Sequence, residues 1–183
     1  YIGKYPVSQK EWRAVMGDNP SSFKGDNLPV ENVSWHDAQE FVQRLSTQTG
    51  KTYRLPTEAE WEFAARGGTK SAGYKYSGSN TLDPVAWYSA NSENRTHPVG
   101  QKLPNELGIY DMSGNVWEWC SDWYGNYNSN TQSNPKGPAS GSDRVLRGGS
   151  WGIVPRGCRS SNRNYFTPLY SYDNYGFRVV LVP

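Results

Sequence analysis

The chain has 183 residues, of which 35% are hydrophobic, 14% aromatic and 20% charged, and its formal net charge is +2. That length predicts a single domain over residues 1–183, because domains usually hold roughly 100–200 residues. Because the positive and negative charges nearly balance, the composition indicates neither a basic surface that binds nucleic acid nor an acidic tail. There is no apolar run of about 18 residues, so we expect no transmembrane helix and no membrane contact by this domain. The sequence does not begin with a signal peptide, and Tyr1 already lies in a pattern that predicts a strand. We therefore expect an N-terminal part of the full protein to precede Tyr1.

Cysteine and histidine are too scarce for most metal centres. The chain has two of each, Cys120 and Cys158 with His36 and His97, and none of them is paired at zinc-finger spacing. A four-cysteine or three-histidine site is therefore excluded. The two cysteines allow at most one disulfide, and two buried free thiols are the alternative.

Three capping signals predict three helices in the N-terminal part of the chain. Ser8 and Thr57 are each followed three residues later by a glutamate, which forms a capping box, and Ser34 is an N-cap; apolar residues then recur at helical spacing. A glycine marks each expected end. The predicted helices begin after Ser8, Ser34 and Thr57 and end near Gly17, Gly50 and Gly67.

Beyond Gly68 the helical periodicity fades. Short apolar runs at residues 116–119, 145–146 and 177–182 predict strands, separated by long aromatic-rich loops. The polar segment 126–141, rich in Ser, Asn and Pro, is predicted to be a mobile insertion. Together the patterns predict an α+β fold with two to three helices, small sheets and much irregular structure.

Two carboxylate groups allow more than one interpretation. Glu58, Glu60 and Glu62 form either a carboxylate site or a capped helix start whose acidic residues the helix dipole favours. Asp111 and Glu118 bracket a Gly-Asn turn, which suits a calcium ion bound by carboxylates and carbonyls. A tight turn with Glu118 paired to an arginine fits the same residues.

The segment 151–175 is rich in aromatic residues and has neither a helical nor an alternating pattern. Tyr mixed with Ser, Gly and Asn is the composition of a binding surface. An aromatic loop buried in its own fold is the alternative. So many aromatics cannot all be buried by one segment without regular structure, and we expect several to be exposed.

Four motifs in order resemble the formylglycine-generating-enzyme (sulfatase-modifying factor) family. They are Leu-Pro-Thr-Glu-Ala-Glu-Trp-Glu-Phe-Ala-Ala-Arg-Gly-Gly from Leu55, Gly-Ile-Tyr-Asp-Met-Ser-Gly-Asn-Val-Trp-Glu-Trp from Gly108, Arg-Val-Leu-Arg-Gly-Gly-Ser-Trp from Arg144, and Gly-Phe-Arg from Gly176. The resemblance implies a C-type-lectin-like fold, with helices flanking small, twisted antiparallel sheets.

The family's catalytic positions do not match this sequence. Its enzymes hold copper with two cysteines and oxidise a substrate cysteine. By the family spacing the first falls at Ile153 and the second at Cys158. One thiolate cannot make a two-thiolate Cu(I) site, so we expect no copper and no enzymatic activity.

The family's calcium site carries over more fully. The resemblance places its ligands at Asp111, Gly114, Val116 and Glu118, using a side-chain oxygen, two carbonyls and a glutamate. All four residue types here are compatible with structural Ca²⁺.

A second resemblance is to variable proteins diversified by retroelements, which use the same fold. Their diversified stretch lies between Gly-Gly-Ser-Trp and a terminal Gly-Phe-Arg, which implies a variable ligand-binding segment at residues 151–175. We expect the aromatic members to act as anchors. The candidate residues are Gly152, Ile153, Val154, Arg156, Gly157, Tyr165, Phe166, Thr167, Leu169, Tyr170, Tyr172, Asp173 and Asn174.

The motifs and the two resemblances are compatible with three functions. The first is a non-enzymatic receptor-like or adhesin-like protein, expected to be a monomer with an unknown protein or cell-surface ligand. Its resemblance to surface lipoproteins implies a place on the bacterial cell surface or outside it. The second is a formylglycine-generating-type oxidase or related modifying enzyme, and the third is an interaction or regulatory domain without diversification.

Overall fold

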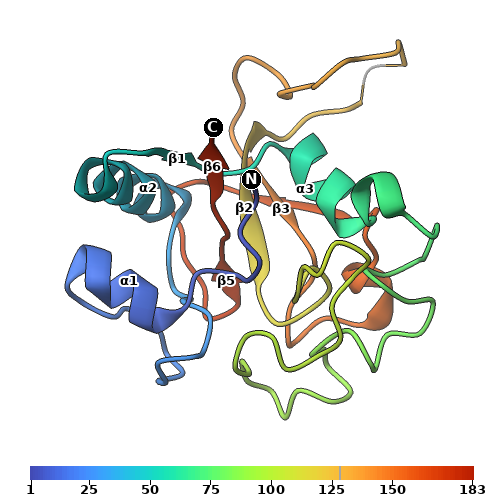
Figure 1. Cartoon of the computed structure of the whole chain (residues 1–183), viewed down its shortest axis with the longest axis horizontal. Coiled ribbons are helices and arrows are strands. Elements are labelled where there is room, and N and C mark those ends of the chain that lie inside the picture. The colour runs from blue at the N-terminus through green and yellow to red at the C-terminus, as the bar shows by residue number, and fades with distance from the viewer. Residues whose placement is uncertain (128) are drawn as a thin grey trace.

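The computed structural model describes residues 1–127 and 129–183. Over these residues the chain forms three α-helices and two small sheets, joined by long irregular segments (Figure 1). The predicted α+β class is confirmed. The helices are α1 Gln9–Met16, α2 Trp35–Thr49 and α3 Glu58–Ala65. The strands are β1 Thr52–Arg54, β2 Trp117–Trp123, β3 Arg144–Arg147, β4 Arg163–Phe166, β5 Tyr175–Gly176 and β6 Val180–Val182.

All three helices begin with a capping box, as predicted at Ser8 and Thr57, and at Ser34, where only the N-cap was predicted, Asp37 completes the box. Thr57, for example, accepts a hydrogen bond from the Glu60 backbone N–H, while the Glu60 side chain accepts from the Thr57 N–H. These reciprocal bonds satisfy backbone donors that a helix start leaves without partners. Gly17 and Gly50 end α1 and α2 in the left-handed conformation that glycine adopts at low cost.

The larger sheet has the strand order β4-β3-β2-β5, and the smaller one pairs β1 with β6. The β2–β3, β3–β4 and β1–β6 pairs are antiparallel, as the fold class implies, but β2 and β5 run parallel. Both faces of the larger sheet are covered. Helices α1 and α2 pack with Trp117 and Trp119 on one face, and α3 packs with Cys120 and Val145 on the other. This alternation of side chains along β2 is what a strand buried on both faces requires.

Two fully buried arginines join the elements. Arg178 donates two 2.7 Å hydrogen bonds to Glu118 and further bonds to the carbonyls of Gly3 and Tyr110. Arg147 donates to Glu62 and to the Ser160 carbonyl. Because a buried charge is tolerated only when it is paired and hydrogen-bonded, both arginines belong to the scaffold.

Arg159, Arg163 and Arg178 lie in the family-like stretches of the sequence, which predicts that all three pair with carboxylates or carbonyls of the scaffold. Arg163 pairs with Glu58 and donates to the Gly125 carbonyl, and Arg178 pairs with Glu118, so both predictions are confirmed. The prediction for Arg159 was wrong, because it is exposed and forms no ion pair within residues 1–127 and 129–183.

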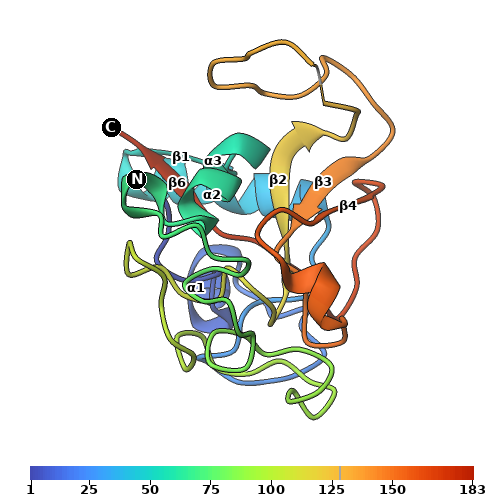
Figure 2. The same ribbon diagram turned by 90° about the vertical axis from the view of Figure 1, so that its right-hand side faces the viewer.

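The segment 151–175 is more regular than predicted. It contains the edge strand β4 and a 3₁₀ turn at Pro155–Cys158. Figure 2 shows β4 at the outer edge of the sheet, beside β3, and shows residues 126–127 and 129–141 in a long loop that stands out from the domain. Among the described residues, no helix is long and apolar enough to span a bilayer.

Candidate functional site

The structure exposes much of the predicted binding segment. Leu169 is 73% exposed, Tyr170 60%, and Tyr165 and Tyr172 47% each. Large apolar side chains that stay open to solvent are candidates for binding contacts. The expectation that several of these aromatics are exposed is confirmed.

Phe166 is the exception and requires a correction. It is half-buried and packs against the core on the α1 and α2 side of the sheet. Its ring also lies 5.3 Å from Tyr172 and 5.8 Å from Tyr175, between ring centres. Phe166 therefore supports the exposed tyrosines from below, and it is not a free surface anchor.

Strand β4 divides the predicted surface between two faces. Tyr165 and Phe166 are adjacent in a strand, so their side chains point to opposite sides. Tyr165 stacks on Tyr124 with ring centres 4.1 Å apart, while Phe166 meets Tyr170 on the other side. The sequence-based prediction of one continuous surface was wrong on this point, because β4 was not recognised as a strand.

The main chain holds the exposed segment in place. The carbonyl of Tyr172 accepts from Asn32 N–H, the carbonyl of Asp173 accepts from the Trp151 indole N–H, and the carbonyl of Asn174 accepts from Trp117 N–H. In addition, Tyr170 N–H donates to the Thr167 carbonyl. These bonds use backbone groups of the segment, so its path depends little on its exposed side chains.

The other predicted stretch, residues 152–157, is only partly available. Val154 and Arg156 are exposed, as is Gly152. Ile153, in contrast, packs against two of the core clusters, and a Cβ on Gly157 would lie 2.2 Å from Ile153 Cγ2. Ile153 and Gly157 are therefore structural positions rather than contact positions.

Trp151 joins the two stretches, and sequence reasoning gave it no such role. Besides its indole bond to Asp173, its ring packs edge-on against Phe23 at 5.8 Å. The neighbouring Asn32 has a φ of 60°, which asparagine tolerates better than most residues. The loop that carries Phe23 and Asn32 thus supports the C-terminal segment. In the sequence, Asn32 is the only residue of this loop that could have indicated its unusual backbone conformation.

Beside Asn32, Glu31 is fully buried. Its Oε1 accepts from Phe23 N–H at 2.8 Å, but Oε2 has no hydrogen-bond partner. Burial raises the pKa of Glu31 to about 7, and the negative charge of Asp173 adds to the shift.

The environments of the two cysteines do not favour the copper-binding thiolate chemistry of the parent family. Cys158 is a buried free thiol packed in the same cluster as Ile153, and burial raises its pKa to about 12. Cys120 is also buried and free, and burial raises its pKa as well. A thiol with so high a pKa stays protonated near neutral pH, whereas a metal ligand or nucleophile must be a thiolate.

The Asp111–Glu118 turn has an internal cation already. Both oxygens of Glu118 accept from Arg178, and Oε2 also accepts from the Trp61 indole N–H at 2.7 Å. A calcium ion on Glu118 would have to share that carboxylate with Arg178. Glu118 is therefore a poor calcium ligand.

Asp111 fits a cation better. Its Oδ2 accepts from Gly100 N–H at 2.7 Å, while its buried Oδ1 has no hydrogen-bond partner. Burial raises the pKa of Asp111 to about 6. Gly114 and Val116, the two predicted carbonyl ligands, lie in the same buried turn.

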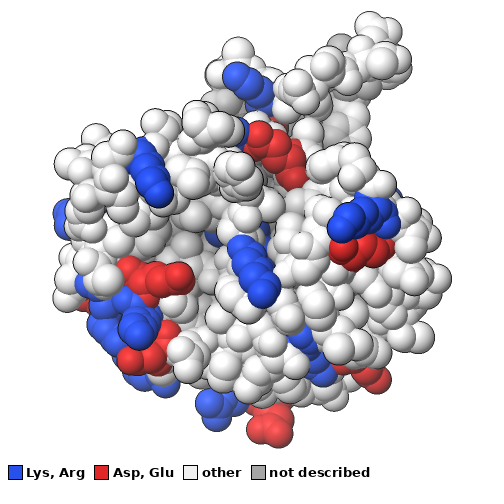
Figure 3. All heavy atoms as spheres, viewed as in Figure 1, with Lys and Arg blue, Asp and Glu red and all other residues white. Residues whose placement is uncertain are grey.

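Charge is dispersed over the visible surface. Figure 3 shows lysine, arginine, aspartate and glutamate in small mixed groups on this face, without one large patch of either sign. A basic stripe of the kind that nucleic acid requires is absent from this view.

The fold and these motifs agree with comparisons to known proteins. The family model of the sulfatase-modifying factor enzyme 1-like domain matches residues 1–182. The chain belongs to this family, and it has the C-type-lectin-like fold that the resemblance implied.

Two characterised relatives show how this chain compares in length. It is 41% identical over 201 residues to the chaperone protein LppX of Paenibacillus barcinonensis, an alignment that covers 82% of this chain and 69% of LppX. It is 39% identical over 191 residues to the formylglycine-generating enzyme of Mus musculus, covering 94% of this chain and 49% of the enzyme. The chain thus spans about half the length of that enzyme.

A solved structure matches the whole chain. Treponema denticola variable protein 1 superposes with a TM-score of 0.94 and 37% sequence identity, covering 100% of this chain and 84% of the other. The scaffold described above is therefore also that of a variable protein.

Proposed function

We propose that this chain is a non-enzymatic ligand-binding protein that displays a diversified C-terminal surface on a C-type-lectin-like scaffold. Tyr170, Tyr172 and Leu169 form the centre of that surface, and Val154 and Arg156 extend it, whereas Tyr165 lies on the opposite side of β4. Tyr and Arg are common among residues that dominate binding energy. The similarity to a variable protein supports this proposal.

One observation carries most of the argument. The segment that holds Leu169, Tyr170 and Tyr172 is fixed by hydrogen bonds that Asn32, Trp117 and Trp151 donate to its main-chain carbonyls, while the side chains of these three residues stay exposed. A site with this construction can change its side chains and keep its shape. Such a separation is what a diversified binding surface needs.

The rival function is an oxidase of the parent family. It is disfavoured because Ile153 stands where a copper-binding thiolate is required, and because the remaining candidate, Cys158, is a buried thiol with a high pKa. A non-diversified interaction domain is the other alternative, and it would use the same exposed residues.

Location and cofactor form part of the proposal. The similarity to a variable protein and to LppX supports a bacterial cell-surface or extracellular setting, with a protein or cell-surface ligand. The unpartnered Asp111 oxygen supports a structural Ca²⁺ held by Asp111 with the carbonyls of Gly114 and Val116. No copper is expected.

The test of diversification is genetic. The genomic region downstream should contain a near-copy of the codons from about Trp151 onward, differing at adenines, and sister isolates should differ at Leu169, Tyr170 and Tyr172. They should agree at the codons for Trp151, Gly157 and Phe166. Sister sequences that are identical at the exposed codons, with no near-copy present, would favour the non-diversified domain.

A further inference from the structure

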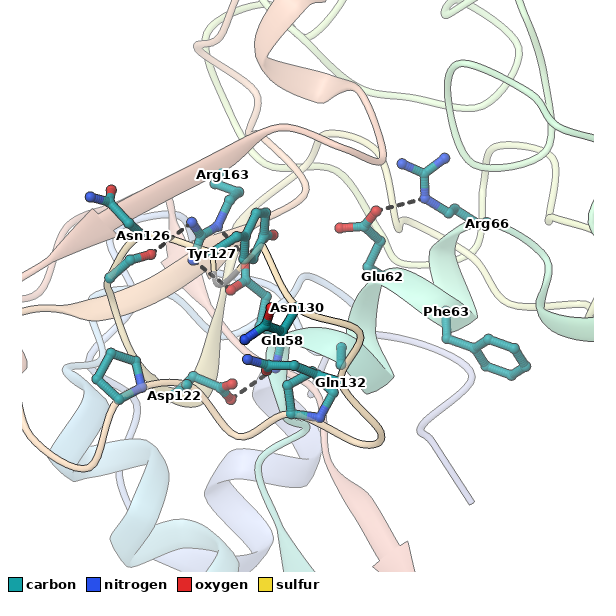
Figure 4. Close-up of a pocket in the computed structure, with 15 residues that line it drawn as sticks. Glu58, Glu62, Phe63, Arg66, Asp122, Asn126, Tyr127, Asn130, Gln132 and Arg163 are labelled. Atoms are coloured by element: carbon teal, nitrogen blue, oxygen red, sulfur yellow. Dashed lines mark hydrogen bonds and ion pairs between the residues drawn. The ribbon is translucent and has the colours of Figure 1, made fainter.

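A cavity in the described part of the chain shares no lining residue with the proposed binding surface. It has a volume of about 780 Å³ and lies between α3 and loop residues from 125–127 and 130–138 (Figure 4). Ligand pockets typically measure about 300–1,000 Å³. From the sequence, Glu58 and Glu62 of its lining stood out only as a possible carboxylate site, because the walls of the cavity come from two segments far apart along the chain.

The loop that walls the cavity is pinned to the domain. Arg163 donates to the Gly125 carbonyl at 3.0 Å, and the Tyr127 hydroxyl donates to Glu58 at 3.2 Å. Gly137 lies so close to the end of β2 that a Cβ there would be 3.0 Å from the Trp123 carbonyl oxygen. These contacts give the cavity a defined shape. The predicted mobility of residues 126–141 remains a prediction.

The charges around the cavity are already neutralised. Glu58 accepts from Arg163 at 2.6 and 2.7 Å, and Glu62 pairs with Arg66 at 2.7 Å and with Arg147. Asp122 accepts from the Glu58 backbone N–H at 2.9 Å and from the Ser121 hydroxyl at 3.0 Å. Glu58 and Glu62 thus pair with three guanidinium groups, and Asp122 is hydrogen-bonded to a backbone amide and a hydroxyl. A charged ligand would have to break these pairs, so a neutral one is favoured.

The uncharged groups that line the cavity can bind a ligand that has both hydroxyl groups and an apolar face of C–H groups. Asn126 and Gln132 bring exposed amides to the cavity, and an amide both donates and accepts hydrogen bonds, as a hydroxyl does. One face of the Tyr127 ring lies 3.9 Å from the Arg163 guanidinium carbon. The ring is nevertheless 65% exposed, so its other face is open for stacking.

We propose that this cavity binds a neutral oligosaccharide, with a sugar ring stacked on Tyr127 and its hydroxyls bonded to Gln132 and the neighbouring amides. An extended ligand is favoured over a single sugar. A second cavity of about 530 Å³ adjoins the first and shares Ala59, Phe63 and Pro135 with it. This site would be distinct from the Tyr170–Tyr172 surface and would act whether or not that surface is diversified.

The test is ligand-observed NMR and calorimetry on the full chain with neutral hexasaccharides of glucose, mannose and N-acetylglucosamine. A hexasaccharide of galacturonic acid is the charged probe. We expect at least one neutral probe to bind at millimolar concentration or better and the charged probe to bind more weakly. Tyr127→Ala and Gln132→Ala should each lower the affinity about tenfold or more, the equivalent of about 1.4 kcal/mol.

Matched controls separate this site from the proposed function. Tyr170→Ala and Gln101→Ala remove an exposed Tyr and an exposed Gln elsewhere, and both should leave sugar affinity unchanged. Because Tyr127→Ala also removes a bond to Glu58, its melting curve is measured, and Gln132→Ala decides the matter if that variant is unfolded. The proposal is overturned by no binding of any neutral probe, by stronger binding of the charged probe, by binding that Tyr170→Ala but not Gln132→Ala abolishes, or by a protein ligand at this cavity.

Discussion

Phe166 and Tyr170 have ring centres 6.1 Å apart, yet they have different environments. Phe166 packs on the core, whereas Tyr170 is 60% exposed. Phe166→Ala should therefore lower the free energy of unfolding by about 1–3 kcal/mol, and Tyr170→Ala by less than about 0.5 kcal/mol. Two exposed surface anchors, as expected from the sequence, would make both changes nearly neutral, and the core packing of Phe166 revises that expectation for Phe166.

Chemical denaturation of the two variants measures this difference. Tyr172→Ala is a second exposed control, and Trp117→Ala, which truncates a buried strand residue, should cost about 3–5 kcal/mol. Equal destabilisation by Phe166→Ala and Tyr170→Ala would show that the exposed segment is core.

Glu31 predicts a pH dependence of stability. Its pKa, ordinarily 4.5, is raised to about 7 by burial, with Asp173 adding to the shift and Lys24 opposing it. A raised folded-state pKa stabilises the fold below about pH 4.5, and that contribution is lost as the pH rises through about 7. Wild-type protein should lose up to about 3 kcal/mol over this range through Glu31.

The measurement is the pH profile of unfolding for wild type and Glu31→Gln. The substitution keeps an acceptor for Phe23 N–H and removes the titration. The variant should be the more stable of the two at pH 8, and their difference should shrink toward pH 5. Parallel profiles over that range would show that Glu31 does not titrate as its burial implies.

At the scale of elements, the turn between Asp111 and β2 tests the calcium proposal. Added calcium should raise the melting temperature by mass action on the folded state, and Asp111→Asn should remove that increment. Glu118→Gln behaves differently, because Glu118 pairs with the buried Arg178. It should cost about 3–5 kcal/mol even without calcium.

Thermal unfolding with calcium or with a chelator distinguishes these effects. Ser113→Ala, in the same turn, is a control that should keep the calcium response. A melting temperature indifferent to calcium, in wild type and Asp111→Asn alike, would count against the metal site.

Local signals predicted the helices well and the strands less well. The capping boxes at Ser8, Ser34 and Thr57 depend on residues three apart, so the sequence contains all the information they need. β1 and β4 were not predicted, since their short sequences become strands by pairing with β6 and β3. Such partners lie far along the chain, and a single sequence does not show them.

For the candidate site, the sequence predicted which side chains are exposed but not on which side of the sheet they lie. Exposure of Tyr170 and Tyr172 followed from aromatic density without periodicity. The two-sided placement of Tyr165 and Phe166 did not, because it depends on β4. The α3 cavity was missed for the same reason, as its walls meet only in the folded chain.

For the whole molecule, the scaffold predicts a lack of oxidase activity. With Ile153 at one thiolate position and a high pKa at Cys158, the protein should not convert the cysteine of a substrate peptide to formylglycine in the presence of copper and oxygen. Oxygen consumption and peptide mass measure this directly. Conversion that Cys158→Ser abolishes would assign the chain to the enzymes.

The most direct measurement is the stability of a library in which Leu169, Tyr170 and Tyr172 are randomised together. Its matched library randomises three buried positions, Trp117, Leu146 and Phe177. If the main chain fixes the surface, most members of the first library should unfold within a few degrees of wild type, and most members of the second should be unfolded. Failure of most members of the first library to fold would contradict a diversifiable binding surface on this scaffold.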